Sequence, residues 1–561
     1  MKNIILYIIL FVISVNGLSQ AKKRRLPRNI NTINYNSYYP AISGDANSLL
    51  FLSNFTNSGA PAIHYSYKID ASTWSDPVEL PRTLNAGHLL FEGGYSLSFD
   101  GKTIFFTSKK SGGIGGYDIW YSKLSGKTWQ TPINMKNKIN SAAHEGMPSV
   151  SSSGQSIYYC RCETINSTKA TGCKIMVANR NGSLWESSEP LPDNINQYAP
   201  QSPKIMADGE TLLFSSAQGG STDLYLTRKK EDGHWSDPVP MNFVNTTENE
   251  QFVSTTAKGR YLYHDVKTEK GRVIEQLLIP DEFTGKKVMH VKGKVNNANT
   301  GEGIPSTLKV YEVATRERIV FEELNENSEF NFALKEGVAY DFSVEAKDKS
   351  YPYFSKLYVL DNMRTSSRDE LKIELSPLAR GEEIGLGALN FDAYSAEIND
   401  NSTYELRRLL RFLKSNSDKK YNLTIHRYNY LEDSLASNVD LTEVLIDTTW
   451  TEVEKIIEVV DTITTEYIVN TIGAASDTSF VSSDSVIYEK RLAVRDSVIM
   501  IPQFKLNYTY HNDRTLKQAQ NLVLYLREKG IPEEQFIIST TKTREKPPRE
   551  IPEIIATLKQ L

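Results

Sequence analysis

Short apolar runs alternate with turn residues between residues 30 and 265, and the pattern repeats about every fifty residues. Each run rich in β-branched and aromatic residues predicts a strand, and Asp-Gly between two such runs is the strongest short signal for a hairpin. The runs at 103–106 and 212–214 each follow an Asp-Gly pair. Roughly four strands per unit of this length are typical of a β-propeller blade.

Tryptophan marks the repeat most clearly, and an Asn follows each Trp about ten residues later. The pairs are Trp74 and Asn85, Trp129 and Asn140, Trp185 and Asn196, and Trp235 and Asn245. The last unit, after residue 252, has no Trp-Pro segment, and a segment like the missing piece lies at 30–42. We therefore expect the N-terminal strand to complete the last blade, so that residues 28–280 form a five-bladed propeller with no exposed edge.

One phrase of the repeat has a family resemblance. Residues 98–108 read Ser-Phe-Asp-Gly-Lys-Thr-Ile-Phe-Phe-Thr-Ser. This phrase resembles the TolB-type propeller repeat, in which a turn of the form Ser-x-Asp-Gly-Lys joins two apolar strands. The resemblance implies that the repeated Trp, Asp and Gly residues serve packing and turn geometry rather than catalysis.

From residue 288 the fifty-residue period stops, and apolar and polar residues alternate with short turns up to residue 376. This pattern predicts a small antiparallel β-sandwich. Residues 288–376 resemble the carboxypeptidase regulatory-like domain, which implies an accessory module. The region has no His-x-x-Glu zinc motif, so a peptidase is not expected.

After a linker at 377–388, the third region alternates strands with helices. Apolar residues spaced three and four apart between 406 and 413 predict a helix, with Ser402 and Glu405 as a capping box at its start. A second helix is predicted at 515–529, ending at Gly530. Strands are expected at 389–392, 423–425 and 535–538, followed by a polar tail.

This β-α-β-α-β order, with the phrases at 390–416 and 519–531, resembles the OmpA-like C-terminal domain, the peptidoglycan-associating module of Gram-negative envelopes. The resemblance assigns 389–561 to that α/β domain and implies contacts with the diaminopimelate of the peptide stem. The family's Arg falls on Gln518, with Lys517 and Arg514 nearby, and its Asp falls on Asn429 or Asp513. Gln cannot make the paired hydrogen bonds by which a guanidinium holds a carboxylate, so weakened binding is expected.

An insertion from about 430 to 505 interrupts the OmpA-like pattern. Between residues 431 and 489 there are 13 Asp and Glu and one Lys, a net charge of −12, together with apolar residues such as Trp450. Two interpretations stay open. The insertion is either a solvated, folded excursion of the domain or a docking surface for a basic partner.

Charge and length narrow the function further. The chain has 561 residues with 64 Lys and Arg against 68 Asp and Glu, which leaves no basic surface for coating nucleic acid. Residues 4–15 are apolar and follow Lys2, and as a helix they would rise about 18 Å, short of the ~30 Å core of a bilayer. We expect residues 1–20 to be a secretory signal and no later segment to span a membrane.

The three cysteines, Cys160, Cys162 and Cys173, lie close together in the sequence. If Cys160 ends one strand and Cys173 begins the next, a disulfide from Cys173 to either of the other two is feasible in an oxidising compartment. Zinc usually takes four ligands, and neither these cysteines nor the eight scattered histidines have a suitable spacing. We expect no metal and no cofactor.

Three functions are weighed. The domain order resembles Bacteroidetes envelope proteins of the type IX secretion and gliding machinery, which implies a non-enzymatic scaffold in the periplasm, at the outer membrane or cell wall. Its partners would be peptidoglycan and envelope or secretion-machinery proteins. The alternatives are a propeller glycosidase, which needs two carboxylates converging in the central channel, and a propeller that binds a ligand near the Gly-rich loop 109–116.

Overall fold

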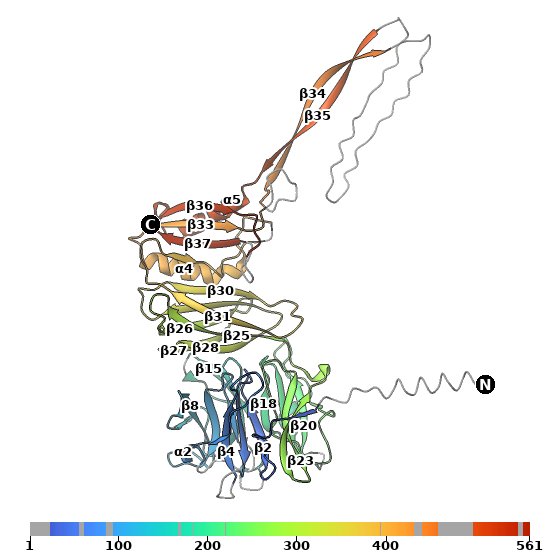
Figure 1. The fold of residues 1–561 in the computed structure, drawn as a ribbon, viewed down its shortest axis with the longest axis vertical. Coiled ribbons are helices and arrows are strands. Elements are labelled where there is room, and N and C mark those ends of the chain that lie inside the picture. Colours follow the sequence, from blue (N-terminus) through green and yellow to red (C-terminus); the bar gives the residue numbers. More distant parts are fainter. Residues whose placement is uncertain are drawn as a thin grey trace, which may run out of the picture. The chain divides into compact units, whose positions relative to one another are not determined.

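The computed structural model describes residues 23–54, 61–85, 94–165, 170–182, 184–218, 220–392, 394–430, 440–457, 497–547 and 554–561. The predicted signal at 1–20 and residues 458–496 of the acidic insertion lie outside the described residues. The chain is mainly β and divides into two compact units (Figure 1). The first unit is Met1–Tyr353 with Leu357–Ser376, and the second is Phe354–Lys356 with Pro377–Leu561.

Within the described residues, the first unit begins with five antiparallel sheets, which we call the five-sheet region (residues 23–278). The first sheet contains β2 (Ser37–Ile42), β3 (Ser48–Ser53), β4 (Ala62–Tyr67) and β5 (Val78–Glu79), and the second contains β6 (Tyr95–Leu97), β7 (Thr103–Ser108), β8 (Asp118–Ser125), β9 (Thr128–Trp129) and β10 (Ile133–Asn134). The third contains β11 (His144–Val150), β12 (Ser156–Cys162), β15 (Lys174–Asn181), β16 (Leu184–Trp185) and β17 (Glu189–Pro190), and the fourth contains β18 (Gln201–Ile205), β19 (Thr211–Ser216), β20 (Asp223–Arg228) and β21 (Val239–Pro240). The last contains β22 (Ser254–Thr255), β23 (Tyr261–Thr268), β24 (Gly271–Leu278) and β1 (Lys23–Arg25). Short elements between these strands are α2 (Arg82–Asn85), α3 (Asp193–Asn196), and the hairpin of β13 (Thr164–Ile165) and β14 (Ala170–Thr171).

The N-terminal strand completes the last sheet, as the sequence predicts. β1 pairs antiparallel with β24, with Arg24 opposite Gln276, and Arg25 forms an ion pair with Glu275 at 3.0 Å. The strand lies at 23–25, ahead of residue 28, where the sequence places the start of the propeller. The outer edge of the last sheet is therefore covered by the beginning of the chain.

The repeated Asn has the same contact in every sheet. Its side-chain carbonyl accepts a 2.8 Å hydrogen bond from a backbone N–H of the third strand, and its amide donates back to the carbonyl of the same residue. The pairs are Asn31 with Ile274, Asn85 with Ile63, Asn140 with Ile119, Asn196 with Ile175, and Asn245 with Leu224. The side-chain amide thus continues the ladder where the outer strand ends.

The Ser-x-Asp-Gly phrase is explained by turn geometry. Ser98 donates to Asp100 at 2.5 Å, and Asp100 accepts from the backbone N–H of Lys102 at 3.0 Å. Gly101 between them has a φ of +72°, where a side chain is strained. These hydrogen bonds stabilise the tight turn between β6 and β7, and they engage the carboxylate of Asp100.

After η1 (Asp281–Phe283) comes a two-sheet sandwich (residues 288–375), which belongs to the first unit apart from Phe354–Lys356, counted with the second. Its strands are β25 (Val288–Asn297), β28 (Glu329–Lys335) and β31 (Ser367–Leu375) in one sheet, and β26 (Ser306–Glu312), β27 (Arg318–Leu324), β29 (Ala339–Ala346) and β30 (Tyr353–Val359) in the other. The prediction of a purely antiparallel sandwich is wrong in one respect, because β25 and β31 pair in parallel. A long connection through the second sheet separates these two strands, which allows the parallel pairing.

The sandwich packs against turns of the five-sheet region. Phe99, Ala207 and Ala257 form an apolar cluster with Val288 and Ala333. Polar contacts surround the cluster, since Lys286 and Lys335 both bind the carboxylate of Glu210, at 2.8 and 2.5 Å. The turns between the first two strands of the sheets therefore form a platform on which the sandwich rests.

The second unit contains a four-stranded sheet in the order β32 (Glu383–Gly385), β37 (Ile554–Gln560), β33 (Tyr421–Arg427) and β36 (Phe536–Lys542). Its helices are η2 (Asp400–Ser402), α4 (Thr403–Ser415), α5 (Arg514–Glu528) and η3 (Glu533–Gln535). β33 and β36 are parallel, and β37 is antiparallel to β33. Both predicted helices are confirmed, and Gly530 has a φ of +86° just after the C-cap of α5.

Three details of the second unit differ from the prediction. The expected strand at 389–392 is only an isolated bridge between Phe391 and Ile398, and the first strand of the sheet is β32. The polar tail contains β37, which pairs with both β32 and β33. The capping box is wrong, because Ser402 exchanges hydrogen bonds with the backbone of Asn390, and the buried Glu405 binds Arg408 instead.

The described part of the acidic insertion forms a two-stranded ribbon of β34 (Glu443–Ile457) and β35 (Ser497–His511). At about 3.3 Å per residue the fifteen-residue strands are about 50 Å long. In Figure 1 the ribbon extends away from the four-stranded sheet of its own unit. Hence the insertion is a folded excursion over these residues, which agrees with the first of the two interpretations.

Removing one of the repeated Asn side chains tests their role in the fold. Asn140→Ala leaves the buried N–H of Ile119 without a partner, while its C=O keeps the hydrogen bond from the N–H of Met135, and we expect the variant to lower the free energy of unfolding of the first unit by about 1–3 kcal/mol. Asn137→Ala, at an exposed position in the same connection, is the matched control. Urea unfolding followed by Trp fluorescence measures both, and an equal loss in the two variants would contradict the assigned role.

The contact between the sandwich and the five-sheet region also predicts a pH dependence. Burial and the nearby Asp100 raise the pKa of Glu322 to about 7 from 4.5. Because the folded state then binds the proton more tightly, the contribution of Glu322 to stability falls as the pH rises from about 4.5 to 7. We expect Glu322→Gln to flatten the pH dependence of urea unfolding in that window, whereas the exposed control Glu326→Gln should leave the wild-type slope.

Candidate functional site

The predicted peptidoglycan residues lie around the start of α5, where the ribbon joins the second unit. Asp440 is 1% exposed and accepts hydrogen bonds from the backbone N–H and the hydroxyl of Thr515, at 2.7 and 2.5 Å. The ammonium of Lys542, at the end of β36, forms an ion pair with Asp440 and donates to the carbonyl of Asn512 at 2.8 Å. The first turn of α5 is therefore held by a buried carboxylate from outside the helix.

Three of the predicted residues gather at the surface of this turn. Asp513 accepts from the hydroxyl of Thr442 and pairs with Lys517 at 3.3 Å, and the Thr442 hydrogen bond lowers the pKa of its carboxyl. Arg514 donates to the carbonyl of Leu441, and its guanidinium lies 5.8 Å from the ring centre of Tyr394. Asp513, Arg514 and Lys517 thus form one partly exposed polar patch.

The other two predicted residues have different environments. Gln518 is 1% exposed, and its amide donates to the carbonyl of Ser395 at 2.9 Å while its side-chain oxygen has no hydrogen-bond partner among the described residues. Asn429 follows β33 with a φ of +55°, and its N–H donates to the carbonyl of Glu545 at 2.8 Å. Gln518 therefore lies beneath the patch rather than on it.

The sequence analysis missed two residues that hold the start of α5, Asp440 and Lys542. Asp440 and Lys542 are separated by about a hundred residues and meet only because α5 begins beside the end of β36. Neither belongs to a local motif. The sequence offered no signal for the pair, because Asp513 already stands at the N-cap position of α5 and is the carboxylate that a helix start predicts.

The ribbon carries a second candidate surface in the same unit. Because side chains alternate along a strand, paired positions such as Trp450 and Phe504 share one face, and their rings lie 5.5 Å apart. Trp450 is 64% exposed and Ile446 is 58% exposed. Further residues on this face are Val444, Thr448, Glu452, Glu454, Met500, Pro502, Leu506, Tyr508 and Tyr510. A face with this many apolar side chains on a two-stranded element suits contact with another protein surface.

The first unit has a crevice of about 1530 Å³ beside β1, β4 and the start of the sandwich. Eight Lys and Arg but four Asp and Glu line it, together with exposed and half-buried Tyr side chains. The ammonium of Lys68 lies 5.4 Å from the ring centre of Trp74, and burial lowers the pKa of that ammonium. Cationic and aromatic groups in one crevice can hold an anionic or sugar-like ligand.

The channel between the inner strands of the five sheets is almost filled. β2, β6, β11, β18 and β22 contribute to two small cavities with volumes of about 30 and 20 Å³. Among the described residues, Lys204 is the one charged side chain that lines either cavity. The two converging carboxylates that a glycosidase would need are not found among the described residues around these cavities.

The Gly-rich loop 109–116 is packed rather than open over its last residues. Asp118 accepts from the backbone N–H groups of Ile114 and Gly115, at 2.5 and 3.2 Å. A Cβ at Gly115 would lie 2.2 Å from the carbonyl of Ser141, and one at Gly116 would meet the ring of His144. Close packing therefore explains these glycines without a ligand.

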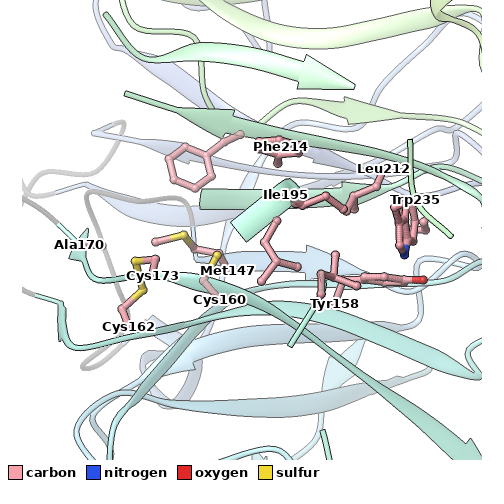
Figure 2. Close-up of a cluster of buried hydrophobic side chains, with 14 of the residues drawn as sticks. Met147, Tyr158, Cys160, Cys162, Ala170, Cys173, Ile195, Leu212, Phe214 and Trp235 are labelled. Carbon is pink, nitrogen blue, oxygen red and sulfur yellow. A yellow bond between two sulfur atoms is a disulfide. The ribbon is translucent and has the colours of Figure 1, made fainter. Parts of the chain in front are cut away.

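Cys160 and Cys162 lie in β12 of the third sheet, and Cys173 lies in the connection from β12 to β15. The structure pairs Cys162 with Cys173, so the disulfide closes the connection that carries β13 and β14. Cys160 is a buried thiol, 3.7 Å from the carbonyl of Pro200. Figure 2 shows all three cysteines with Met147 at one end of a buried apolar cluster that reaches Trp235.

Two general searches of the described residues complete the survey. No helix in this part of the chain is long and apolar enough to cross a bilayer. In the same residues, no three His, Cys, Asp or Glu side chains lie close enough to hold a metal ion.

Comparisons with known proteins can now be added. No protein-family model matches the sequence, and no curated protein matches it either. Similar solved structures include a protein assigned as TolB from Agrobacterium tumefaciens, 14% identical, with a TM-score of 0.27 over 53% of this chain and 90% of that one.

Carbohydrate-active enzymes are also among the similar structures. An endo-arabinase from Bacteroides thetaiotaomicron VPI-5482 is 17% identical, with a TM-score of 0.30 over 46% of this chain and 96% of that one. An oligogalacturonate lyase from Vibrio parahaemolyticus is 10% identical, with a TM-score of 0.29 and coverages of 48% and 96%. The neighbours thus include TolB, a β-propeller family, together with carbohydrate-active enzymes.

The buried carboxylate at the start of α5 gives a prediction for the candidate site. Asp440→Ala removes the cap of Thr515 and leaves the Lys542 ammonium without its partner, so we expect the opening of α5 to become easier by roughly 3–5 kcal/mol. The partly exposed Asp513→Ala should cost at most about 1 kcal/mol. Hydrogen exchange of amides 515–528 measures both, and equal effects would contradict the buried role of Asp440.

Proposed function

We propose that this chain is an exported, non-catalytic scaffold of the bacterial envelope. In this proposal the five sheets of the first unit are the blades of one closed propeller, and the propeller and the sandwich bind envelope or secretion-machinery proteins. The second unit is an OmpA-like domain that attaches the protein to peptidoglycan or to the outer membrane. The protein is periplasmic and needs no cofactor.

The observation that carries the proposal is the filled channel of the five-sheet region. Glycoside hydrolysis requires a pair of carboxylates about 5–10 Å apart around a site large enough for a sugar ring. Cavities of about 30 and 20 Å³ hold no sugar, and no described carboxylate lines them. The buried Glu145, for example, is bound by Ser141 and Arg161, at 2.5 and 2.7 Å. This favours binding over hydrolysis.

Further support comes from the cysteines and the order of the domains. A disulfide such as Cys162–Cys173 persists in oxidising compartments, which agrees with export. The order of propeller, sandwich and OmpA-like domain resembles that of PorE, a component of type IX secretion, although PorE has additional tetratricopeptide repeats before its propeller. The resemblance supports the architecture and names envelope proteins as the partners.

Attachment to the wall rests on the patch at the start of α5. Peptide stems carry carboxylates, and Arg514 and Lys517 offer cations on a partly exposed surface. Gln518 stands where the family has its Arg and is buried, so Arg514 and Lys517 take over the contact with the stem. Single charge-assisted hydrogen bonds replace the paired bonds of a guanidinium fork, and the affinity is correspondingly lower.

A second candidate function is supported by the crevice of the first unit. Its excess of Lys and Arg and its Tyr side chains suit an acidic glycan, which would make the protein a glycan-binding module rather than a scaffold. The two functions differ in the unit that binds, because the crevice belongs to the first unit and the α5 patch to the second.

Co-sedimentation with purified diaminopimelate-type peptidoglycan tests the proposal on the full chain. We expect the wild-type protein to sediment and the double variant Arg514→Gln/Lys517→Gln to bind about tenfold less, since both cations of the patch are lost. Arg527→Gln, near the other end of α5, is the matched control and should bind like the wild type.

The outcomes separate the candidates. Equal binding by the double variant and the control would remove the α5 patch from the proposal. A soluble acidic polysaccharide that is bound equally by these variants but lost in Lys68→Gln/Arg260→Gln would favour the crevice instead.

A further inference from the structure

The channel of the five-sheet region contains a lone cation. Lys204 lies in β18 and lines both cavities of the channel. No ion pair joins its ammonium to another described residue. Every other described residue that lines the two cavities is uncharged. The Lys204 side chain is half-buried, and its ammonium lacks the opposite charge that usually accompanies a charge drawn away from bulk water.

The surroundings of the ammonium are largely apolar on both sides. The 30 Å³ cavity is bordered by Tyr39 and Phe252, whose ring centres lie 4.6 Å apart, and by Met147. The 20 Å³ cavity is bordered by Phe99 and Ala257, which belong to the cluster beneath the sandwich. Burial in these surroundings lowers the pKa of Lys204 to about 8.

A second group points to the same cavity independently. The hydroxyl of Ser96, in β6, is buried and has no hydrogen-bond partner among the described residues, and Ser96 lines the 30 Å³ cavity together with Lys204. The other hydroxyls of that cavity are engaged, since Ser254 exchanges hydrogen bonds with the backbone of Ile42 and Ser202 donates to the sulfur of Met147. The cavity therefore offers two free donors, one of them charged, and no free carboxylate.

The volume limits what can be bound. A cavity of this measure needs roughly 10–15 Å³ for one water molecule, so about 30 Å³ accommodates a monatomic anion or a water pair. Sulfate, a sugar or a substrate carboxylate with its carbon chain is too large. An acceptor that carries a full negative charge satisfies both donors and neutralises the ammonium, which water cannot do.

We propose that the channel of the five-sheet region is a binding site for a small monatomic anion of the size of chloride or bromide, held by the ammonium of Lys204 and the hydroxyl of Ser96. The ion joins β6 and β18, which belong to different sheets, and so stabilises the ring of inner strands. Its role is structural, and it is independent of the function proposed above.

Bromide titration of the full chain tests the site. Sodium bromide replaces sodium gluconate at constant ionic strength, and urea unfolding is followed by Trp fluorescence, because five of the six Trp lie in the first unit. Above its dissociation constant, each tenfold rise in bromide should lower the unfolding equilibrium constant of the first unit about tenfold. Crystals grown in bromide should show an anomalous scattering peak between Lys204 and Ser96.

Three variants make the result specific. Lys204→Met should abolish the response to bromide, and Ser96→Ala should weaken the affinity about tenfold through the loss of one hydrogen bond to a charged partner. Lys230→Met, at an exposed position, is the matched control and should respond like the wild type. A wild-type protein that ignores bromide, or a Lys204→Met variant that responds fully, would overturn the proposal. If Lys204→Met does not fold, Ser96→Ala and the anomalous peak decide.

Discussion

The first unit depends on one constraint above all: the polar groups of every strand edge must find partners. The last sheet meets this constraint only because β1, from the beginning of the chain, hydrogen bonds to β24. Where the short outer strands end, the side-chain amides of the repeated Asn residues take over the pairing, as Asn140 does for Ile119. The turns, the apolar clusters and the platform for the sandwich all rest on sheets completed in this way. The filled channel follows from the same arrangement, since inner strands brought this close leave room for little more than one ion.

Much of the five-sheet region could be predicted from the sequence because its residue pattern recurs several times along the chain. The Trp and Asn positions recur at a nearly constant spacing, and a residue that makes the same contact in every sheet leaves a period that can be recognised without any alignment. The partner of Asn31, Ile274, lies at the other end of the five-sheet region, yet the matching segment at 30–42 still revealed that the N-terminus completes the last sheet. The C-terminal end of the helix before Gly530 could be predicted for another reason, because the positive φ at that position favours glycine.

What was missed depends on contacts that have no local signature. Asp440 and Lys542 meet through the tertiary structure alone, and nothing near either residue predicts the pair. β37 was hidden in a segment that follows prolines and ends in Lys and Gln, although its alternating apolar residues Ile554, Ala556 and Leu558 suit a strand between two others. The capping box was wrong because the Ser402 hydroxyl binds Asn390 instead of the helix. The candidate residue Gln518 could be located on its helix from the sequence, but its burial could not.

The ribbon of the second unit poses a different energetic problem. Two strands alone are marginally stable in water, and here one face exposes Trp450 and Ile446.

The pairing of β1 with β24 in the first unit affects how the protein is made. β1 is synthesised first and β24 only after some 250 further residues, so the last sheet cannot be completed until almost the whole five-sheet region has been made. Pairing over such a sequence distance is slow, and until it occurs β24 presents an open edge to other chains. The edge of β24 therefore needs protection from other chains for as long as β1 has not paired with it.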